Sequence, residues 1–268
     1  MRSILENDDR LVLQELEPSE FRKALNKEVK AGRPRVIVSG GDGTLALAAS
    51  CLVGTDTALA VLPGGTLNHF AKRIGLPEDS GEALEIALNG QAKPVGVGCV
   101  NGEVFINTFS VGAYVSFVRT RDYLQRRMSY RLASLVAALR RFAELQSSTL
   151  LLDGKRLRTP QLFVGVDERE LQFPRMGVAH DDSSAGLHLM AVLSQGRLDS
   201  LLTAMKLLTQ GTDVVRRAEN IDTDLKNTFI VDHPQKNKKM RVAIDGELVF
   251  IETPLRLSYK PEALRVIV

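Results

Sequence analysis

The segment VIVSGGDGTLALAAS, Val36–Ser50, decides the fold. Three β-branched residues lead into a run of glycines around Asp42, and an alanine-rich stretch follows. This order is typical of a short buried strand, a tight turn and a helix. The same order returns where Ala58–Leu62 runs into Pro-Gly-Gly-Thr and then into the helical segment Leu67–Ile74. Two such units predict βαβ connections and therefore a parallel sheet.

The flanking sequence divides the chain into two predicted domains. Residues 18–30 form an amphipathic pattern with Ser19 as the expected N-cap, and Gly32 is expected to end this helix. Beyond Lys93 short apolar runs dominate, and Asn101-Gly102 between two of them is a strong hairpin signal. We predict an α/β plus β fold. A three-layer α/β domain with a parallel sheet spans residues 1–92, and a mostly antiparallel β-rich domain spans 93–268, with its last strand returning to the first domain.

Composition excludes several classes of protein. Lys and Arg number 35 against 32 Asp and Glu, a net charge of +3, which is far from that of a dedicated nucleic-acid binder. Two cysteines and four histidines show no zinc-ligand spacing, and a reducing, cytoplasmic location fits best. No apolar run is long enough for a membrane-spanning helix, and the acidic N-terminus does not resemble a signal peptide.

The glycines around Asp42 favour a phosphate site. The first amides of a helix point outward and carry partial positive charge, so they bind anions. Absent side chains at Gly40, Gly41 and Gly43 let backbone approach a phosphate, and Thr44 adds a hydroxyl donor. An acid beside phosphates suits metal binding or proton removal in phosphoryl transfer. The alternative is a tight turn in which Asp42 accepts loop amides.

A second glycine loop, LPGGTLNHF at Leu62–Phe70, strengthens the nucleotide interpretation. Both loops follow strands of one parallel sheet, so they leave the same edge and can face one ligand. The pattern GxGxxA of dinucleotide binders is formally present, but no acidic residue ends the following strand. A Walker A sequence is absent from the chain.

The segments SGGDGTL, LPGGTLNHFAK, FINTFSVG (Phe105–Gly112) and AIDGE (Ala243–Glu247) together resemble the diacylglycerol kinase catalytic-domain family of lipid kinases. That family includes bacterial kinases and the sphingosine and ceramide kinases. GGDGT alone also suits NAD kinases, which share the fold.

The resemblance implies transfer of a γ-phosphoryl group from ATP, with Mg²⁺, to a lipid hydroxyl. It implies Asp42 and Glu247 as the catalytic acids, with Asp42 as a magnesium ligand, and does not decide which carboxylate takes the proton. The residues implied in cofactor binding are Gly40, Gly41, Gly43, Thr44, Gly65, Thr66 and Asn68.

Several positions depart from the family pattern. The family's first strand with its NPxxG loop is expected to be missing, His69 replaces an acid, and Val95–Gly98 replaces an acid-containing segment. Residues 183–186 (Ser-Ser-Ala-Gly) occupy the place of LDDG, so we predict that the family's structural magnesium site is not formed. These departures leave open a catalytically inactive lipid- or nucleotide-binding protein. An NAD kinase-like activity is a further alternative.

Contacts with partners are also predicted. Seven arginines lie in residues 119–141 against one acid, which suits either peripheral contact with anionic headgroups at the inner membrane face or a solvated helix face. A homodimer through the shortened sheet edge is expected. His69 is either a general base or a helix-capping residue.

Overall fold

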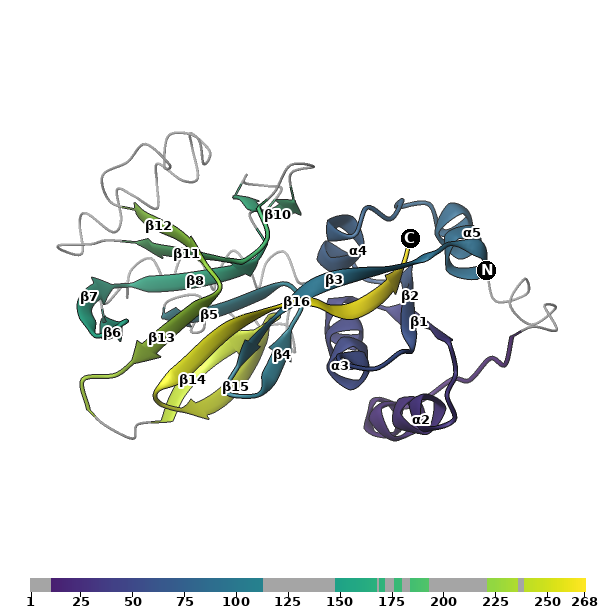
Figure 1. Cartoon of the computed structure of the whole chain (residues 1–268), viewed down its shortest axis with the longest axis horizontal. Coiled ribbons are helices and arrows are strands. Elements are labelled where there is room, and N and C mark those ends of the chain that lie inside the picture. Colours follow the sequence, from purple (N-terminus) through teal and green to yellow (C-terminus); the bar gives the residue numbers. More distant parts are fainter. Residues whose placement is uncertain are drawn as a thin grey trace, which may run out of the picture. The chain divides into compact units, whose positions relative to one another are not determined.

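The computed structural model describes residues 11–112, 148–167, 169–171, 176–179, 184–192, 221–235 and 239–268 (Figure 1). The chain divides into two compact units, one of Met1–Val95 with Glu262–Val268 and the other of Gly96–Pro261. The basic segment 119–141 lies outside the described residues. No helix within the described ranges has the length and apolar character that a bilayer crossing demands.

Parallel strands form the centre of the first unit. β1 (Arg35–Gly40) pairs in parallel with β2 (Ala58–Pro63). β2 also pairs in parallel with the C-terminal end of β16 (Leu255–Ile267). β1 leads into α3 (Asp42–Leu52), and β2 leads into α4 (His69–Arg73) and α5 (Ser80–Asn89). The predicted repeat of strand, glycine turn and helix is therefore confirmed.

Helices cover these strands. Successive residues of a strand point to opposite faces, and on one face Ala58, Ala60 and Leu62 of β2 pack against α5. α3 contacts β1 and β2, and α2 (Pro18–Lys30) packs on α3. The buried residues of α3 are Leu45, Ala48, Ala49 and Leu52. Helix, sheet and helix give the three-layer arrangement expected from the sequence.

The start of α2 differs from the prediction. Its N-cap is Glu17 rather than Ser19, and Pro18 is its first helical residue. Proline suits that position because its φ is already helical and it has no N–H that would need an acceptor. The predicted end is confirmed, since the helix stops at Lys30 and Gly32 adopts a φ of +69°.

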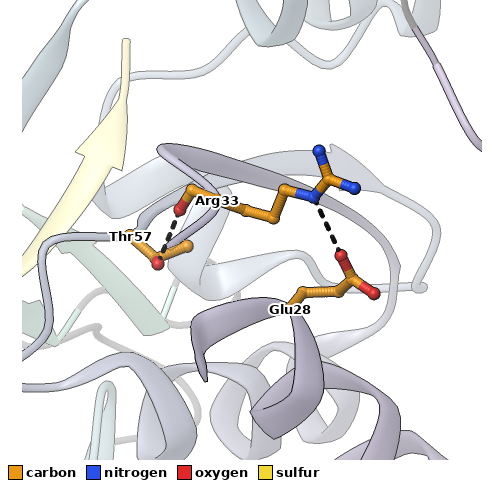
Figure 2. Close-up of polar contacts among 3 residues, drawn as sticks. All are labelled: Glu28, Arg33 and Thr57. Atoms are coloured by element: carbon orange, nitrogen blue, oxygen red, sulfur yellow. Dashed lines mark hydrogen bonds and ion pairs between the residues drawn. The ribbon is translucent and has the colours of Figure 1, made fainter. Parts of the chain in front are cut away.

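Polar contacts fix the segment that enters β1. Arg33 Nε donates to Glu28 Oε2 at 3.2 Å, and Thr57 Oγ1 donates to the carbonyl of Arg33 at 2.7 Å (Figure 2). The guanidinium of Arg35 donates at 2.6 to 2.8 Å to three carbonyls at the end of α5, those of Ala87, Leu88 and Gly90. Arg35 therefore ties the first residue of β1 to the helix that covers it.

The second unit consists of antiparallel strands. One sheet has the order β12-β11-β8-β5-β14-β15. Its strands are β5 (Thr108–Gly112), β8 (Gln161–Val166), β11 (Leu187–Val192), β12 (Ile221–Lys226), β14 (Lys239–Ile244) and β15 (Glu247–Glu252). A second run joins β16 to β13 (Thr228–Asp232), β6 (Ser148–Leu152) and β7 (Lys155–Thr159). β9 (Arg169–Leu171) and β10 (Met176–Ala179) pair separately.

One apolar core serves both runs of strands in the second unit. It joins Phe229 and Leu257 from one run to Phe109, Val164 and Leu187 from the other. The predicted hairpin around Asn101-Gly102 connects β3 (Ala92–Val100) to β4 (Glu103–Phe105). Both turn residues have positive φ, as that type of hairpin requires. The predicted fold class, an α/β part followed by a β-rich part, is confirmed.

Candidate functional site

The two glycine loops of the first unit lie backbone against backbone. The N–H of Gly64 donates to the carbonyl of Gly40 at 3.0 Å. A Cβ atom added to Gly65 would stand 2.8 Å from Cα of Gly41, and one added to Gly64 would stand 3.3 Å from Cα of Gly40. Side chains at these positions would push the loops apart. The glycines are therefore required by the packing of the two loops, whatever else they bind.

Asp42 joins the same two loops through its side chain. Oδ2 accepts the N–H of His69 at 3.2 Å, and Oδ1 accepts the N–H of Phe70 at 3.0 Å. Asn68, which has a φ of +50°, accepts the N–H of Gly65 with Oδ1 at 2.9 Å. Asp42 therefore does accept backbone amides, as the alternative of a tight turn predicted. These amides belong to the second glycine loop and not to the loop that contains Asp42.

The N-terminus of α3 remains suited to an anion. The first bond within the helix runs from the N–H of Leu45 to the carbonyl of Gly41 at 3.1 Å. The N–H groups of Gly43 and Thr44 consequently have no acceptor inside the helix. A Cβ at Gly40 would stand 2.7 Å from Cβ of Thr44, so glycine is needed there for Thr44 to keep its place. A carboxylate within this turn limits the site to anions that arrive with a compensating cation.

A second carboxylate, that of Asp245, organises the second unit. It accepts the backbone N–H groups of Ile106 at 2.9 Å, Asn107 at 2.7 Å and Thr108 at 2.8 Å. In return the N–H of Asp245 donates to the carbonyl of Thr108 at 2.8 Å. Asp245 and Gly246, with φ of 47° and 86°, form the turn between β14 and β15.

Asp245 was missed as a site residue in the sequence, where only Glu247 of AIDGE was singled out. The available signal was the Asp-Gly pair after a strand, because Asp side chains in turns commonly accept backbone N–H groups. Glu247 is the first residue of β15 and its side chain is exposed. It belongs to a different unit from Asp42.

The predicted site residues therefore fall into two groups, because Glu247 lies in the second unit and all the others lie in the first. Gly40, Gly41, Asp42, Gly65 and Asn68 are in mutual contact in the first unit. Thr44 contacts this group through Gly40, and Thr66 is exposed in the second loop. His69 lies at the start of α4 and is partly buried.

The residues fit ATP with magnesium in part. The amides at the start of α3 and the side-chain-free loops suit phosphates. Mg²⁺ bound with a nucleotide often uses only one or two protein carboxylates, and Asp42 can supply one. Among the described residues no three His, Cys, Asp or Glu side chains gather into a metal site. Residues 183–186, the counterpart of LDDG, lie partly outside the described residues. The absence of the family's structural magnesium site therefore stays a prediction.

A cavity of about 830 Å³ opens at the other end of the same strands. It is lined by residues at the start of β1 and β2, among them Arg33, Arg35 and Thr57, and by Arg265. No predicted site residue lines it. Because ligands of open α/β sheets bind at the carboxyl ends of the strands, we place the candidate site at the glycine loops.

Comparison with known proteins agrees with the resemblance to lipid kinases that the sequence motifs indicated. Residues 1–100 match the family model described as the diacylglycerol kinase catalytic domain. The chain is 29% identical over 262 residues to a protein of Pseudomonas aeruginosa strain UCBPP-PA14 named "Probable lipid kinase YegS-like", covering 93% of this chain and 82% of that protein. It is 43% identical over 75 residues to the diacylglycerol kinase of Bacillus subtilis strain 168, covering 27% of this chain and 25% of that protein.

The fold has counterparts among solved structures. A crystal structure of a diacylglycerol kinase from Bacillus anthracis str. Sterne superimposes with a TM-score of 0.65 at 18% identity. The match covers 95% of this chain and 83% of that chain.

Proposed function

Because the chain belongs to the diacylglycerol kinase catalytic-domain family, we propose that it is a lipid kinase that transfers the γ-phosphoryl group of ATP to a lipid hydroxyl. The observation that carries this proposal is the pair of glycine loops at the carboxyl ends of β1 and β2, held together by Asp42. This arrangement leaves backbone amides and bare backbone facing one edge of a parallel sheet, which is where phosphates bind.

In this proposal the first unit binds the nucleotide. The amides of Gly43 and Thr44 and the hydroxyl of Thr44 hold phosphate oxygens, and Thr66 and Asn68 border the nucleotide or the lipid headgroup. Asp42 would hold Mg²⁺, which would neutralise phosphate charge. Asp42 also keeps the second loop in place, since both of its oxygens accept amides of that loop.

The second unit supplies the other acid. Glu247 is exposed at the start of β15 and is the better candidate for accepting the proton of the lipid hydroxyl, because its side chain is accessible. Asp245 fixes the turn from which Glu247 projects by binding the segment Ile106–Thr108. Positioning and charge neutralisation would then account for catalysis, as in phosphoryl transfer generally.

A nucleotide-binding protein without turnover is the second candidate. The observation that favours it is the engagement of both Asp42 oxygens by backbone amides, which gives this residue a structural role that needs no chemistry. A kinase and a silent binder share the loops and the affinity for ATP. Only turnover distinguishes them.

Location and membrane contact are further parts of the proposal. Cys51 and Cys99 are free thiols, which supports a reducing compartment such as the cytoplasm. A lipid acceptor requires at least transient contact with a bilayer, and the arginines of residues 119–141 are the proposed contact with anionic headgroups.

The test is transfer of labelled γ-phosphate from ATP with Mg²⁺ into diacylglycerol, phosphatidylglycerol, sphingosine or ceramide in mixed micelles. We expect label in one lipid and its loss in Asp42→Asn and Glu247→Gln. A thermal shift of the same samples with ATP and Mg²⁺ reports binding separately. Binding of ATP without label in any lipid would support the silent binder. A protein that neither binds ATP nor labels any lipid would refute both candidates.

A further inference from the structure

The strands β16, β13, β6 and β7 of the second unit carry arginines on one exposed face. These strands lie side by side in that order (Figure 1). Successive side chains of a strand point to opposite faces, and the buried residues Leu150 and Leu257 identify the face toward the core. Arg156 and Arg158 of β7 and Arg256 of β16 have the opposite orientation and are exposed. We call this side of the four strands the outer face.

The three guanidinium groups of the outer face lack partners. Within the described part of the chain none of them forms an ion pair or a side-chain hydrogen bond, whereas nearby Lys226 pairs with Asp224 at 2.6 Å. Asp232 is the only acidic residue that points outward from the paired segments of these strands. Its Oδ1 accepts the N–H of His233 at 2.7 Å. Three arginines against one carboxylate leave the outer face positive.

The arginines are spread over the outer face and do not converge on one point. Neighbouring strands lie about 4.8 Å apart, so the backbone positions of Arg156 and Arg256, three strands from each other, are separated by roughly 14 Å. Two partly exposed aliphatic side chains lie beside them. Leu151 is directly opposite Arg156, and Ile230, which is 39% exposed, is directly opposite Arg256. This mixture suits an extended anionic surface better than a single small anion.

Nucleic acids and anionic bilayers are the two main kinds of extended anionic surface. Sheet faces that bind single-stranded nucleic acid stack the bases on aromatic side chains. None of the outward residues in the paired segments of these strands is aromatic. Arginines attract anionic headgroups, and aliphatic side chains between them can enter the boundary below the headgroups. The composition of the outer face therefore favours a bilayer.

We propose that the outer face, through Arg156, Arg158 and Arg256, binds the surface of an anionic lipid bilayer. The choice of a bilayer rests in part on the proposed function, because a kinase with a lipid acceptor must reach a membrane. The outer face belongs to the second unit, which also contains Glu247, the proposed base. This contact is additional to the one proposed for residues 119–141.

Sedimentation with lipid vesicles, in the absence of ATP, tests the proposal. We expect binding to vesicles of phosphatidylcholine mixed with phosphatidylglycerol, little binding to phosphatidylcholine alone, and weaker binding at high salt. Combined Arg156→Gln, Arg158→Gln and Arg256→Gln should lower the partition coefficient roughly 100-fold, because each arginine near an anionic surface contributes a factor of about five.

A matched variant separates the outer face from net charge. Lys23, Lys27 and Lys30 are exposed on α2 in the first unit, and their combined change to Gln removes the same charge. This variant should bind vesicles as the wild type does. Since all the substituted side chains are exposed, both variants should keep the wild-type melting temperature within a few degrees, which a thermal scan verifies.

A second pair of variants tests the aliphatic part of the outer face. Ile230→Thr removes an exposed apolar side chain and keeps a β-branched residue in the strand. Phe250→Thr is its control, because Phe250 is 63% exposed on β15 in the other sheet of the same unit. We expect weaker vesicle binding in the first variant only.

Three outcomes would overturn the proposal. They are a wild type that does not bind the mixed vesicles, equal losses in the arginine and lysine variants, and binding of single-stranded RNA without binding of vesicles. None of them affects label transfer in mixed micelles, so the proposed kinase could still stand. Conversely, vesicle binding that depends on the three arginines, without label in any lipid, would support the outer face as a membrane contact and reject the kinase.

Discussion

Each unit of this protein contains an aspartate that ties two backbone segments together, but the two ties relate differently to the proposed chemistry. Asp42 accepts the amides of His69 and Phe70 and is itself a candidate for binding magnesium. Asp245 accepts the three amides of Ile106–Thr108, and the candidate base is Glu247, two residues later. In the first unit, structure and chemistry would share one carboxylate. In the second unit they are separate.

The difference determines what mutagenesis can resolve. A change at Asp42 alters the loop geometry and the proposed metal ligand together, so lost activity there has two explanations. Changes at Asp245 and Glu247 can be made one at a time, which separates holding the turn from accepting a proton.

The largest expected effect on stability is that of Asp245→Ala. It removes the carboxylate that accepts three amides where Ile106 is fully buried and Asn107 is 4% exposed. Unsatisfied buried donors cost about 1–3 kcal/mol each, and we expect a loss of about 3 kcal/mol in the free energy of unfolding. Urea denaturation measures it. Asp245→Asn keeps one acceptor oxygen and tolerates the positive φ, so its loss should be smaller.

Glu247→Gln should reduce activity and leave stability unchanged. The side chain is exposed, so its replacement should alter the unfolding free energy by less than about 0.5 kcal/mol. Loss of a general base should lower kcat about 100-fold or more. The matched change Asp42→Asn should lower both activity and stability, because one of two amides loses its acceptor. Equal stability losses in the two variants would remove the distinction drawn between the units.

A pair of glycine substitutions probes the loop contact that Asp42 stabilises. Gly65→Ala places a methyl group 2.8 Å from Cα of Gly41, whereas Gly41→Ala places one 3.4 Å from Cα of Gly65. We expect Gly65→Ala to cost about 1–3 kcal/mol through steric overlap and Gly41→Ala to cost much less. Thermal unfolding of the two variants measures the difference. The reverse order would mean that the loops are not packed as described.

The smallest effect is expected for His69→Asn. Asp42 Oδ2 accepts the backbone N–H of His69, and this bond survives the substitution. We expect kcat within about threefold of the wild type and stability within about 0.5 kcal/mol. A pH profile of kcat in both proteins is the measurement. Loss of an ionisation near neutral pH in the variant would assign the imidazole a catalytic role after all.

Much of the first unit could be predicted from local sequence. Val36–Val38 and Ala58–Leu62 are short apolar runs between glycines, and both are strands in the structure. The start of α2 was wrong because Ser19 is a good N-cap by type, whereas Pro18 already suits the first helical turn. The glycines were assigned to phosphate approach, and their contact across the two loops could not be foreseen from either loop alone.

The sequence by itself predicted the parallel sheet, the two glycine loops at one of its edges and the resemblance to a lipid kinase family, because these depend on patterns within a few tens of residues. Only the tertiary structure decided the partners of Asp42 and Asp245. Their bonds join residues 27 and 28 positions apart in the first case and 137 to 139 apart in the second. A carboxylate accepts any amide that the fold brings within reach, and which amide arrives is a property of packing rather than of the local sequence.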